Sequence, residues 1–276
     1  MIPAAFEYVR AGSVDEAIAA LAEHGDEAKL LAGGHSLLPL MKLRLAFPSV
    51  LIDVGRVREL DFVREDGDQI VVGALTRHSE LARNDLVRQE APLLARAASL
   101  IGDPQVRHRG TIGGSLAHGD PASDLPAVVL ALGATLVAQG PDGRREIAAD
   151  DMFQGFLETA LDEDEMLTEI RLPRAAGRGW SYQKFTRRSQ DWAIVAVAAV
   201  TGGGGAPSVT LVNMGTRPMR ATETESALAS GSSPADAAAL AADGTEPPAD
   251  LVASSDYRRH LATVLTRRAL EEAASR

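Results

Sequence analysis

The chain has 276 residues and a net charge of −10 at pH 7, and its 45% hydrophobic and 24% charged residues are ordinary for a globular protein. The negative charge argues against a general nucleic-acid binder, and the absence of cysteine excludes a disulfide, a thiolate nucleophile or a cysteine-ligated iron–sulfur cluster on this chain. No apolar run approaches the ~18 residues of a membrane span, and the N-terminus lacks a signal-peptide pattern, so we expect a cytoplasmic location.

The first elements in the chain predict a small α/β lobe. Residues 13–16 (SVDE) form a capping box, and the apolar spacing after it predicts a helix that ends at Gly25. A short strand over 29–32, a brief helix over 37–45 and a buried strand over 50–54 follow.

A second lobe begins with an alternating apolar strand. A helix is predicted from about Gln89 to Ile101, and an apolar helix from Asp124 to Leu132 is ended by Gly133. Strands are predicted over residues 69–75, 134–138, 144–148 and 165–172.

Residues 174–179 predict a linker, after which the pattern changes to antiparallel strands over 180–186, 192–201 and 208–214. The chain from Thr222 is alanine-rich and helical, and a long helix begins near Asp256. The predicted fold is therefore α+β: a domain over 1–175, divided into lobes of about 1–55 and 56–175, and a C-terminal domain over 176–276.

Two diglycine motifs, Gly33-Gly34 and Gly113-Gly114, suggest the chemistry. Glycine lets a ligand approach main-chain N–H groups closely, and two such concavities could hold both halves of a pyrophosphate, as in a dinucleotide cofactor. A tight turn without a ligand would leave the same pattern. The chain has neither G-x-G-x-x-G nor a P-loop, so a Rossmann site or a nucleotide triphosphatase is not supported.

The residues around both motifs resemble a known family. The stretches are 32–39 (AGGHSLLP), 111–124 (TIGGSLAHGDPASD), 164–173 (DEMLTEIRLP) and 215–221 (GTRPMRA). They are similar to the FAD-binding medium subunit of molybdenum hydroxylases, a family that includes aerobic carbon monoxide dehydrogenase and xanthine dehydrogenase-like enzymes. The resemblance covers nearly the whole chain.

The resemblance implies a two-lobed FAD-binding fold of the vanillyl-alcohol oxidase type and an FAD-dependent oxidoreductase subunit that holds FAD non-covalently. It implies a large partner with the molybdenum cofactor and a small partner with [2Fe–2S] clusters, in a dimer of heterotrimers that can lie peripherally at the inner face of the membrane. Electrons would pass from the clusters to FAD and then to an external acceptor. Carbon monoxide dehydrogenase is the favoured activity; an N-heterocycle or aldehyde hydroxylase and a stand-alone flavin oxidase remain open.

The resemblance also assigns cofactor contacts. Asp124 matches an acidic contact, Leu167 a main-chain contact to the flavin, and Lys184 a cation at the carbonyl edge of the ring. From the residues alone, Asp124 could cap a helix, Lys184 could be a solvated strand charge, and Leu167 would be core. The two motifs would contribute Ala32, Gly33, Gly34, His35, Ser36, Leu37, Thr111, Ile112, Gly113, Gly114 and Ser115.

Two further positions belong to the expected cofactor site. Trp192 would cover one face of the flavin ring, or would anchor the C-terminal sheet as a buried residue. Ile101 stands where relatives can place an aromatic residue, so its aliphatic side chain leaves stacking open. We expect no catalytic acid or base and no metal ligand on this chain, because the flavin supplies the chemistry.

Overall fold

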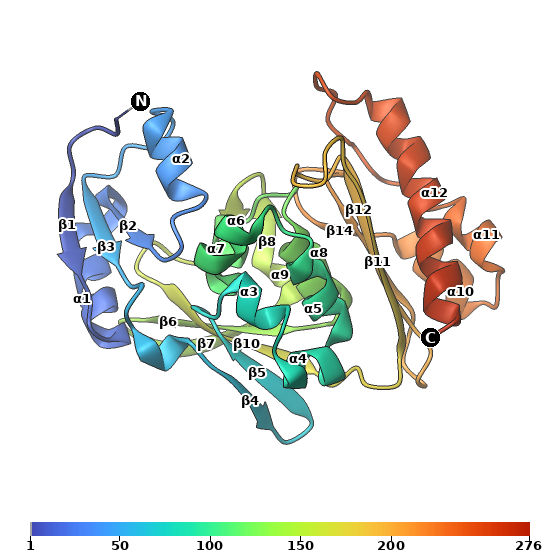
Figure 1. The fold of residues 1–276 in the computed structure, drawn as a ribbon, viewed down its shortest axis with the longest axis horizontal. Helices are drawn as coiled ribbons and strands as arrows, with labels where there is room; N and C mark the ends of the chain where they lie inside the picture. The colour runs from blue at the N-terminus through green and yellow to red at the C-terminus, as the bar shows by residue number, and fades with distance from the viewer. Residues whose placement is uncertain (1) are drawn as a thin grey trace.

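The computed structural model describes residues 2–276, which form an N-terminal lobe, a second lobe and a C-terminal domain (Figure 1). The N-terminal lobe contains a three-stranded parallel sheet in the order β1–β3–β2. Ser13 caps α1 by accepting a hydrogen bond from the Glu16 N–H, and Gly25 ends the helix at a φ of 55°, as predicted. The elements are β1 (Glu7–Arg10), α1 (Val14–His24), β2 (Ala28–Leu31), α2 (Leu37–Lys42) and β3 (Val50–Asp53).

The second lobe contains a five-stranded antiparallel sheet in the order β4–β5–β10–β6–β7, with helices on one face. Its strands are β4 (Val63–Asp66), β5 (Gln69–Gly73), β6 (Thr135–Gly140), β7 (Gly143–Ala148) and β10 (Met166–Pro173), with a small hairpin of β8 (Phe153–Gly155) and β9 (Glu158–Thr159). Its helices are α3 (His78–Leu81), α4 (Asp85–Glu90), α5 (Pro92–Ser99), α6 (Pro104–Arg109), α7 (Ile112–His118), α8 (Asp124–Ala131) and α9 (Ala149–Met152).

The C-terminal domain is a four-stranded antiparallel sheet that stands between the helices of the second lobe and α12 (Figure 1). Its elements are β11 (Gly179–Phe185), β12 (Val195–Thr201), β13 (Ser208–Val212), β14 (Met219–Arg220), α10 (Thr222–Ala229), α11 (Pro234–Ala238) and α12 (Ser255–Ala274). This arrangement confirms the predicted α+β fold of two lobes followed by an antiparallel sheet with helices. None of the helices within residues 2–276 combines the length and apolarity needed to cross a bilayer.

The hydrophobic core is divided into clusters rather than continuous. Ile18 and Ile52 belong to a cluster that fills the N-terminal lobe and extends to Leu75 and Met166 of the second lobe. Leu125 of α8 and Ala198 of β12 belong to a larger cluster, which joins the second lobe to the near face of the C-terminal sheet. Leu265 of α12 packs in a further cluster on the far face of that sheet. The C-terminal sheet therefore shares a core with the second lobe, whereas the N-terminal lobe is joined to the second lobe through a smaller cluster.

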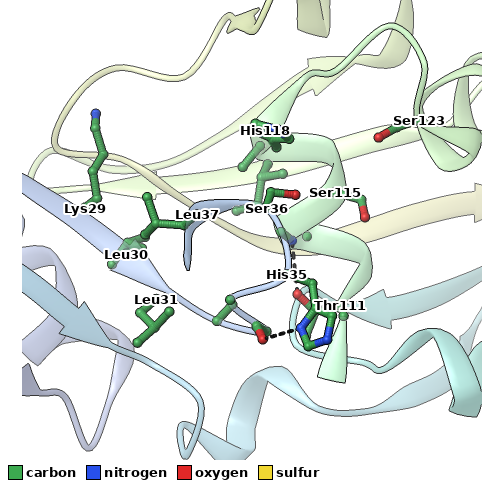
Figure 2. A pocket seen from close by; sticks show the side chains of 18 of the residues that line it. Lys29, Leu30, Leu31, His35, Ser36, Leu37, Thr111, Ser115, His118 and Ser123 are labelled. Carbon is green, nitrogen blue, oxygen red and sulfur yellow. Dashed lines mark hydrogen bonds between the residues drawn. The ribbon is translucent and has the colours of Figure 1, made fainter. Parts of the chain in front are cut away.

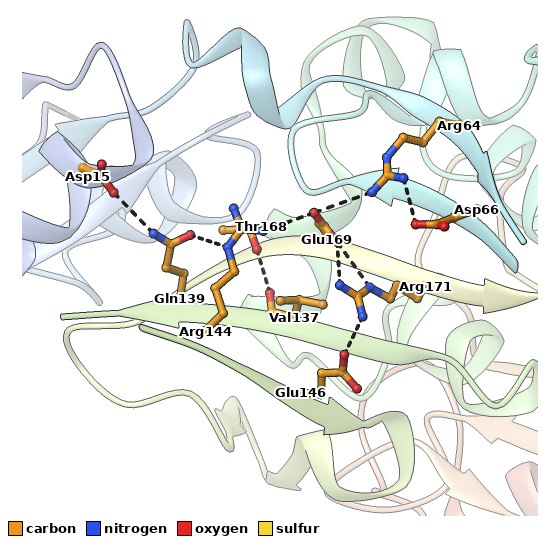
Figure 3. Close-up of polar contacts among 10 residues, drawn as sticks. All are labelled: Asp15, Arg64, Asp66, Val137, Gln139, Arg144, Glu146, Thr168, Glu169 and Arg171. Carbon is orange, nitrogen blue, oxygen red and sulfur yellow. Dashed lines mark hydrogen bonds and ion pairs between the residues drawn. The ribbon is translucent and has the colours of Figure 1, made fainter. Parts of the chain in front are cut away.

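The other face of the second-lobe sheet carries charge (Figure 3). Ile170 points into the core, so its neighbours Glu169 and Arg171 lie on the opposite side of the strand. The Glu169 carboxylate is 3.1 Å from Arg171 and 3.6 Å from Arg144, and its side chain is only 11% exposed. Arg64 of β4 lies 4.0 Å from the same carboxylate. Ion pairs therefore cross this face from β4 to β7.

Some elements differ from their predictions. The helix predicted over 89–101 is two helices, because Pro92 begins α5 and cannot donate the hydrogen bond that would continue α4. The second diglycine motif is not a turn but the first turn of α7, which Thr111 caps by accepting from the Gly114 N–H at 3.2 Å. The strand predicted from Trp192 begins at Val195, and the short strands β1 and β4 were not predicted.

Candidate functional site

A cavity of about 1050 Å³ lies between the N-terminal lobe and the second lobe (Figure 2), and its lining includes Lys184 and Trp192 of the C-terminal domain. Ile112 does not line it: its side chain is fully buried in the core, and its N–H donates to the Thr76 carbonyl at 3.1 Å. The other residues predicted to contact a cofactor all line the cavity, and they are Ala32, Gly33, Gly34, His35, Ser36, Leu37, Ile101, Thr111, Gly113, Gly114, Ser115, Asp124, Leu167, Lys184 and Trp192.

The first diglycine motif presents unused hydrogen-bond donors. It connects the end of β2 to α2, and Gly34 has a φ of 74°, which favours glycine. The consecutive main-chain N–H groups of residues 33–36 find no acceptor within residues 2–276. The His35 ring folds back so that its Nδ1 lies 3.1 Å from the Gly33 carbonyl (Figure 2). A run of free N–H groups beside a cavity is a typical anion site.

The second motif works differently, because its main-chain donors are already used. Gly113 donates to the Ala74 carbonyl at 2.8 Å, and Ser115 donates to the Thr111 carbonyl at 3.1 Å. A Cβ on Gly113 would lie 2.6 Å from the Ala74 side chain, so this glycine allows α7 to pack closely against the end of β5. The motif therefore offers the cavity the Thr111 and Ser115 hydroxyls more than a row of amides.

Gly33 brings the two motifs together. A Cβ on Gly33 would lie 2.3 Å from the Arg109 carbonyl oxygen and 2.9 Å from the Gly110 Cα, atoms that immediately precede the second motif. Arg77 donates to the same Arg109 carbonyl, which holds it in place. Only a residue without a side chain permits this approach of the two lobes.

Asp124 of α8 and Lys184 of β11 form a buried ion pair where the cavity meets the C-terminal domain. Lys184 Nζ lies 2.9 Å from Asp124 Oδ2, and the two side chains are 6% and 7% exposed. The interpretation of Lys184 as a solvated charge is therefore wrong, and Ser123, not Asp124, occupies the N-cap of α8. Burial raises the pKa of Asp124, and the opposing effect of the Lys184 ammonium favours the ionised carboxylate. The pair couples the second lobe to β11.

Leu167, Ile101 and Trp192 also line the cavity. Leu167 is buried in β10 beside an irregularity in the pairing with β6, and Ile101 is half-buried after α5. Trp192 is 56% exposed, so the interpretation of Trp192 as a buried anchor of the C-terminal sheet is wrong. Its ring remains available to a ligand.

His78 lines the cavity and was not predicted. It begins α3, is only 3% exposed, and its Nε2 lies 3.3 Å from the Ser115 hydroxyl. Burial lowers its pKa to about 4, and the charges of Arg77, His35 and Arg107 act in the same direction, so the ring is neutral at pH 7. A single buried histidine in a helical stretch carries no sequence signal that separates it from core. Residues 2–276 contain no group of three or more His, Asp or Glu side chains placed to hold a metal.

We expect His78 to make the protein acid-sensitive. Its folded pKa of about 4 lies below the usual histidine pKa of 6.5, so between these values the unfolded state binds more protons. Stability is therefore complete above about pH 6.5 and falls by up to about 3 kcal/mol as the pH drops toward 4. Urea unfolding at several pH values across this range measures the free energy of unfolding, which should depend less steeply on pH in His78→Gln. The exposed His260→Gln variant should keep the original slope, and equal slopes in all three proteins would contradict the prediction.

Comparisons with known proteins agree with this geometry. The family described as "FAD binding domain in molybdopterin dehydrogenase" matches residues 4–175. The family described as "CO dehydrogenase flavoprotein C-terminal domain" matches residues 180–273. Together the two matches extend over both lobes and the C-terminal domain.

Individual relatives match over their full length. The carbon monoxide dehydrogenase medium chain of Hydrogenophaga pseudoflava is 44% identical, over 100% of this chain and 99% of the relative. The glyceraldehyde dehydrogenase medium chain of Sulfolobus acidocaldarius is 38% identical, over 99% of this chain and 100% of the relative. A solved chain of carbon monoxide dehydrogenase from Hydrogenophaga pseudoflava superposes with a TM-score of 0.97 at 45% identity, covering 100% of this chain and 99% of that one.

Proposed function

The chain belongs to the FAD-binding medium subunits of the molybdenum hydroxylases, and we propose that it is the electron-transfer flavoprotein subunit of an aerobic carbon monoxide dehydrogenase. The observation that carries the proposal is the cavity between the lobes, with free N–H donors at one wall and a buried lysine at its far end. The 44% identity to a carbon monoxide dehydrogenase medium chain favours carbon monoxide as the substrate of the complex.

The residues present fit FAD. The unpaired N–H groups of residues 33–36 suit the pyrophosphate, and the hydroxyls of Thr111 and Ser115 face the same cavity from the opposite lobe. Lys184 would place its ammonium near the flavin, where a cation stabilises negative charge on the reduced ring. The exposed Trp192 ring and the buried Leu167 would lie beside it.

FAD would supply the redox chemistry of this subunit, the capacity to hold and release an electron pair. The chain binds and orients the cofactor and sets the charge around it. Because the chain has no cysteine, the iron–sulfur clusters that deliver electrons must belong to another polypeptide. We therefore propose a large molybdenum-cofactor partner and a small iron–sulfur partner, in a cytoplasmic dimer of heterotrimers that passes electrons to an external acceptor.

An aldehyde or N-heterocycle hydroxylase is the second candidate. It is favoured by the 38% identity to a glyceraldehyde dehydrogenase medium chain, because this relative shares the whole length of the chain and serves a different substrate. Substrate oxidation would occur on the large partner, so both candidates use the present cavity in the same way.

Purification of the chain with its natural partners tests the proposal. We expect a flavin spectrum, about one FAD per chain released on denaturation, and iron–sulfur absorbance that disappears when the partners are removed. Carbon monoxide should reduce the flavin only in the complete complex, and reduction only by an aldehyde or a heterocycle would support the second candidate. A preparation without flavin, or flavin on the isolated chain reduced directly by a small substrate, would contradict both.

A further inference from the structure

We propose that Tyr182 is a positioning residue for Lys184: its hydroxyl holds the Asp124 carboxylate in the orientation in which that carboxylate anchors the Lys184 ammonium beside the cavity. The inference rests on the proposed function, since the ammonium is expected to face the flavin. Tyr182 does not line the cavity itself. Its effect on a cofactor would therefore pass through Asp124 and Lys184.

The geometry assigns one oxygen of the carboxylate to each partner. Tyr182 and Lys184 are two positions apart on β11, so their side chains lie on the same face of the strand. The Tyr182 hydroxyl donates to Asp124 Oδ1 at 2.5 Å, and Lys184 Nζ donates to Asp124 Oδ2 at 2.9 Å. With Oδ1 held by the tyrosine, rotation of the carboxylate away from the lysine would break both hydrogen bonds.

Burial makes the tyrosine hard to replace. Tyr182 is 4% exposed and Asp124 is 6% exposed, so little solvent contacts the pair to take over the role of the hydroxyl. Burial, and next the charge of Asp124, raise the pKa of Tyr182 well above its usual value, so the hydroxyl remains a donor at neutral pH. A donor to a buried carboxylate also draws negative charge away from the oxygen facing the lysine.

Two of the three N–H groups of the Lys184 ammonium are used within the described residues. One reaches Asp124 and a second reaches the Leu100 carbonyl at 3.3 Å. The third has no acceptor within residues 2–276, and Lys184 lines the cavity. Two hydrogen bonds fix the position of the ammonium at the end of a flexible side chain, which is the condition for electrostatic preorganisation.

The seam between α8 and the C-terminal sheet should survive removal of the hydroxyl. Thr210 of β13 donates to the Ala127 carbonyl at 2.7 Å, and the Asn213 N–H donates to the Pro121 carbonyl at 2.8 Å. These contacts hold the same seam without touching Asp124. Tyr182→Phe therefore removes one hydrogen bond, and Thr210→Val is a matched control that removes a buried hydroxyl from the neighbouring part of the seam.

The experiment compares both variants in the assembled complex, with flavin content, FAD affinity and the flavin midpoint potential as readouts. We expect Tyr182→Phe to retain flavin, to bind FAD roughly 10-fold more weakly and to have a lower midpoint potential. Thr210→Val should leave the potential unchanged. In a Lys184→Gln background, Tyr182→Phe should shift the potential no further, because the residue through which it acts has lost its charge.

An unchanged potential in Tyr182→Phe, or a shift that persists undiminished in Lys184→Gln, would overturn the proposal. If Tyr182→Phe does not assemble, 3-fluorotyrosine at position 182 keeps the ring and provides a stronger donor. It should raise the potential, and an unchanged potential there would also contradict the inference. Absence of FAD from the unmodified complex would instead refute the proposed function, so the two failures are distinguishable.

Discussion

Gly33→Ala is expected to abolish retention of the cofactor while leaving the chain folded. The φ of Gly33 lies outside the left-handed region, so alanine can adopt its backbone conformation. The obstacle is space: the new Cβ would lie 2.3 Å from the Arg109 carbonyl oxygen. That oxygen belongs to the main chain and also accepts from Arg77, so it cannot rotate away. The loop over 33–36 must move instead, and its free N–H groups then leave the cavity wall.

Overpacking of this kind costs about 1–3 kcal/mol and sometimes more, and misdirected phosphate donors add to the loss, so we expect FAD affinity to fall by at least ~100-fold. The measurement is the ratio of flavin to protein after purification, followed by titration with FAD. Gly12→Ala is the matched control, because its Cβ would meet only the flexible Glu16 side chain, at 3.2 Å. Stoichiometric flavin in Gly33→Ala would show that the two motifs do not need their close approach.

Lys184→Met is expected to destabilise the protein by about 3–5 kcal/mol, because it leaves the buried Asp124 carboxylate without a counter-charge. It should also lower the flavin midpoint potential. The variant therefore tests two roles of Lys184. One is its charge near the cofactor, and the other is its part in an ion pair that joins β11 to α8. Denaturant unfolding of the chain, with and without FAD, measures the first effect.

The controls separate burial from charge. Asp124→Leu combined with Lys184→Met removes both charges and should recover most of the lost stability. Arg259→Met breaks an exposed pair, in which the Arg259 and Asp256 side chains are 43% and 96% exposed, and should cost less than about 1 kcal/mol. A loss in Lys184→Met no larger than that in Arg259→Met would contradict a structural role for the pair.

Local signals predicted much of the fold. Ser13 and Gly25 delimit α1 because a capping hydroxyl and a glycine of positive φ act within a few residues of the helix ends. The break at Pro92 was also legible in the sequence, because proline favours the first turn of a helix, but the predicted helix began three residues earlier, at Gln89. The strand β1 was missed because its pattern of exposed side chains carries no apolar run, and only its parallel pairing with β3 makes it a strand.

The site was harder to predict because its contacts join distant parts of the chain. The family resemblance assigned Asp124 and Lys184 to the cofactor site one by one. No local pattern indicates that these residues, sixty positions apart, form an ion pair with each other. The two diglycine motifs look alike in sequence, yet among residues 2–276 acceptors are found for the N–H groups of the second motif and not for those of the first. That difference depends on Ala74 and Thr76, which accept from the second motif across a tertiary contact.

The N-terminal lobe and most of the second lobe pack in different hydrophobic clusters, which has a consequence for how the protein responds to an empty cavity. Ile18 and Ile52 pack in a cluster that meets the second lobe at Leu75 and Met166, whereas Leu125, which also lines the cavity, belongs to the larger cluster. A ligand that touches both walls acts as a thermodynamic cross-link, whose stabilisation grows with the logarithm of its concentration over Kd. Opening of the N-terminal lobe as a cooperative unit would then be the event that both releases the ligand and exposes backbone amides to exchange. Release of the cofactor and susceptibility of the chain to proteolysis would then depend on the same opening equilibrium.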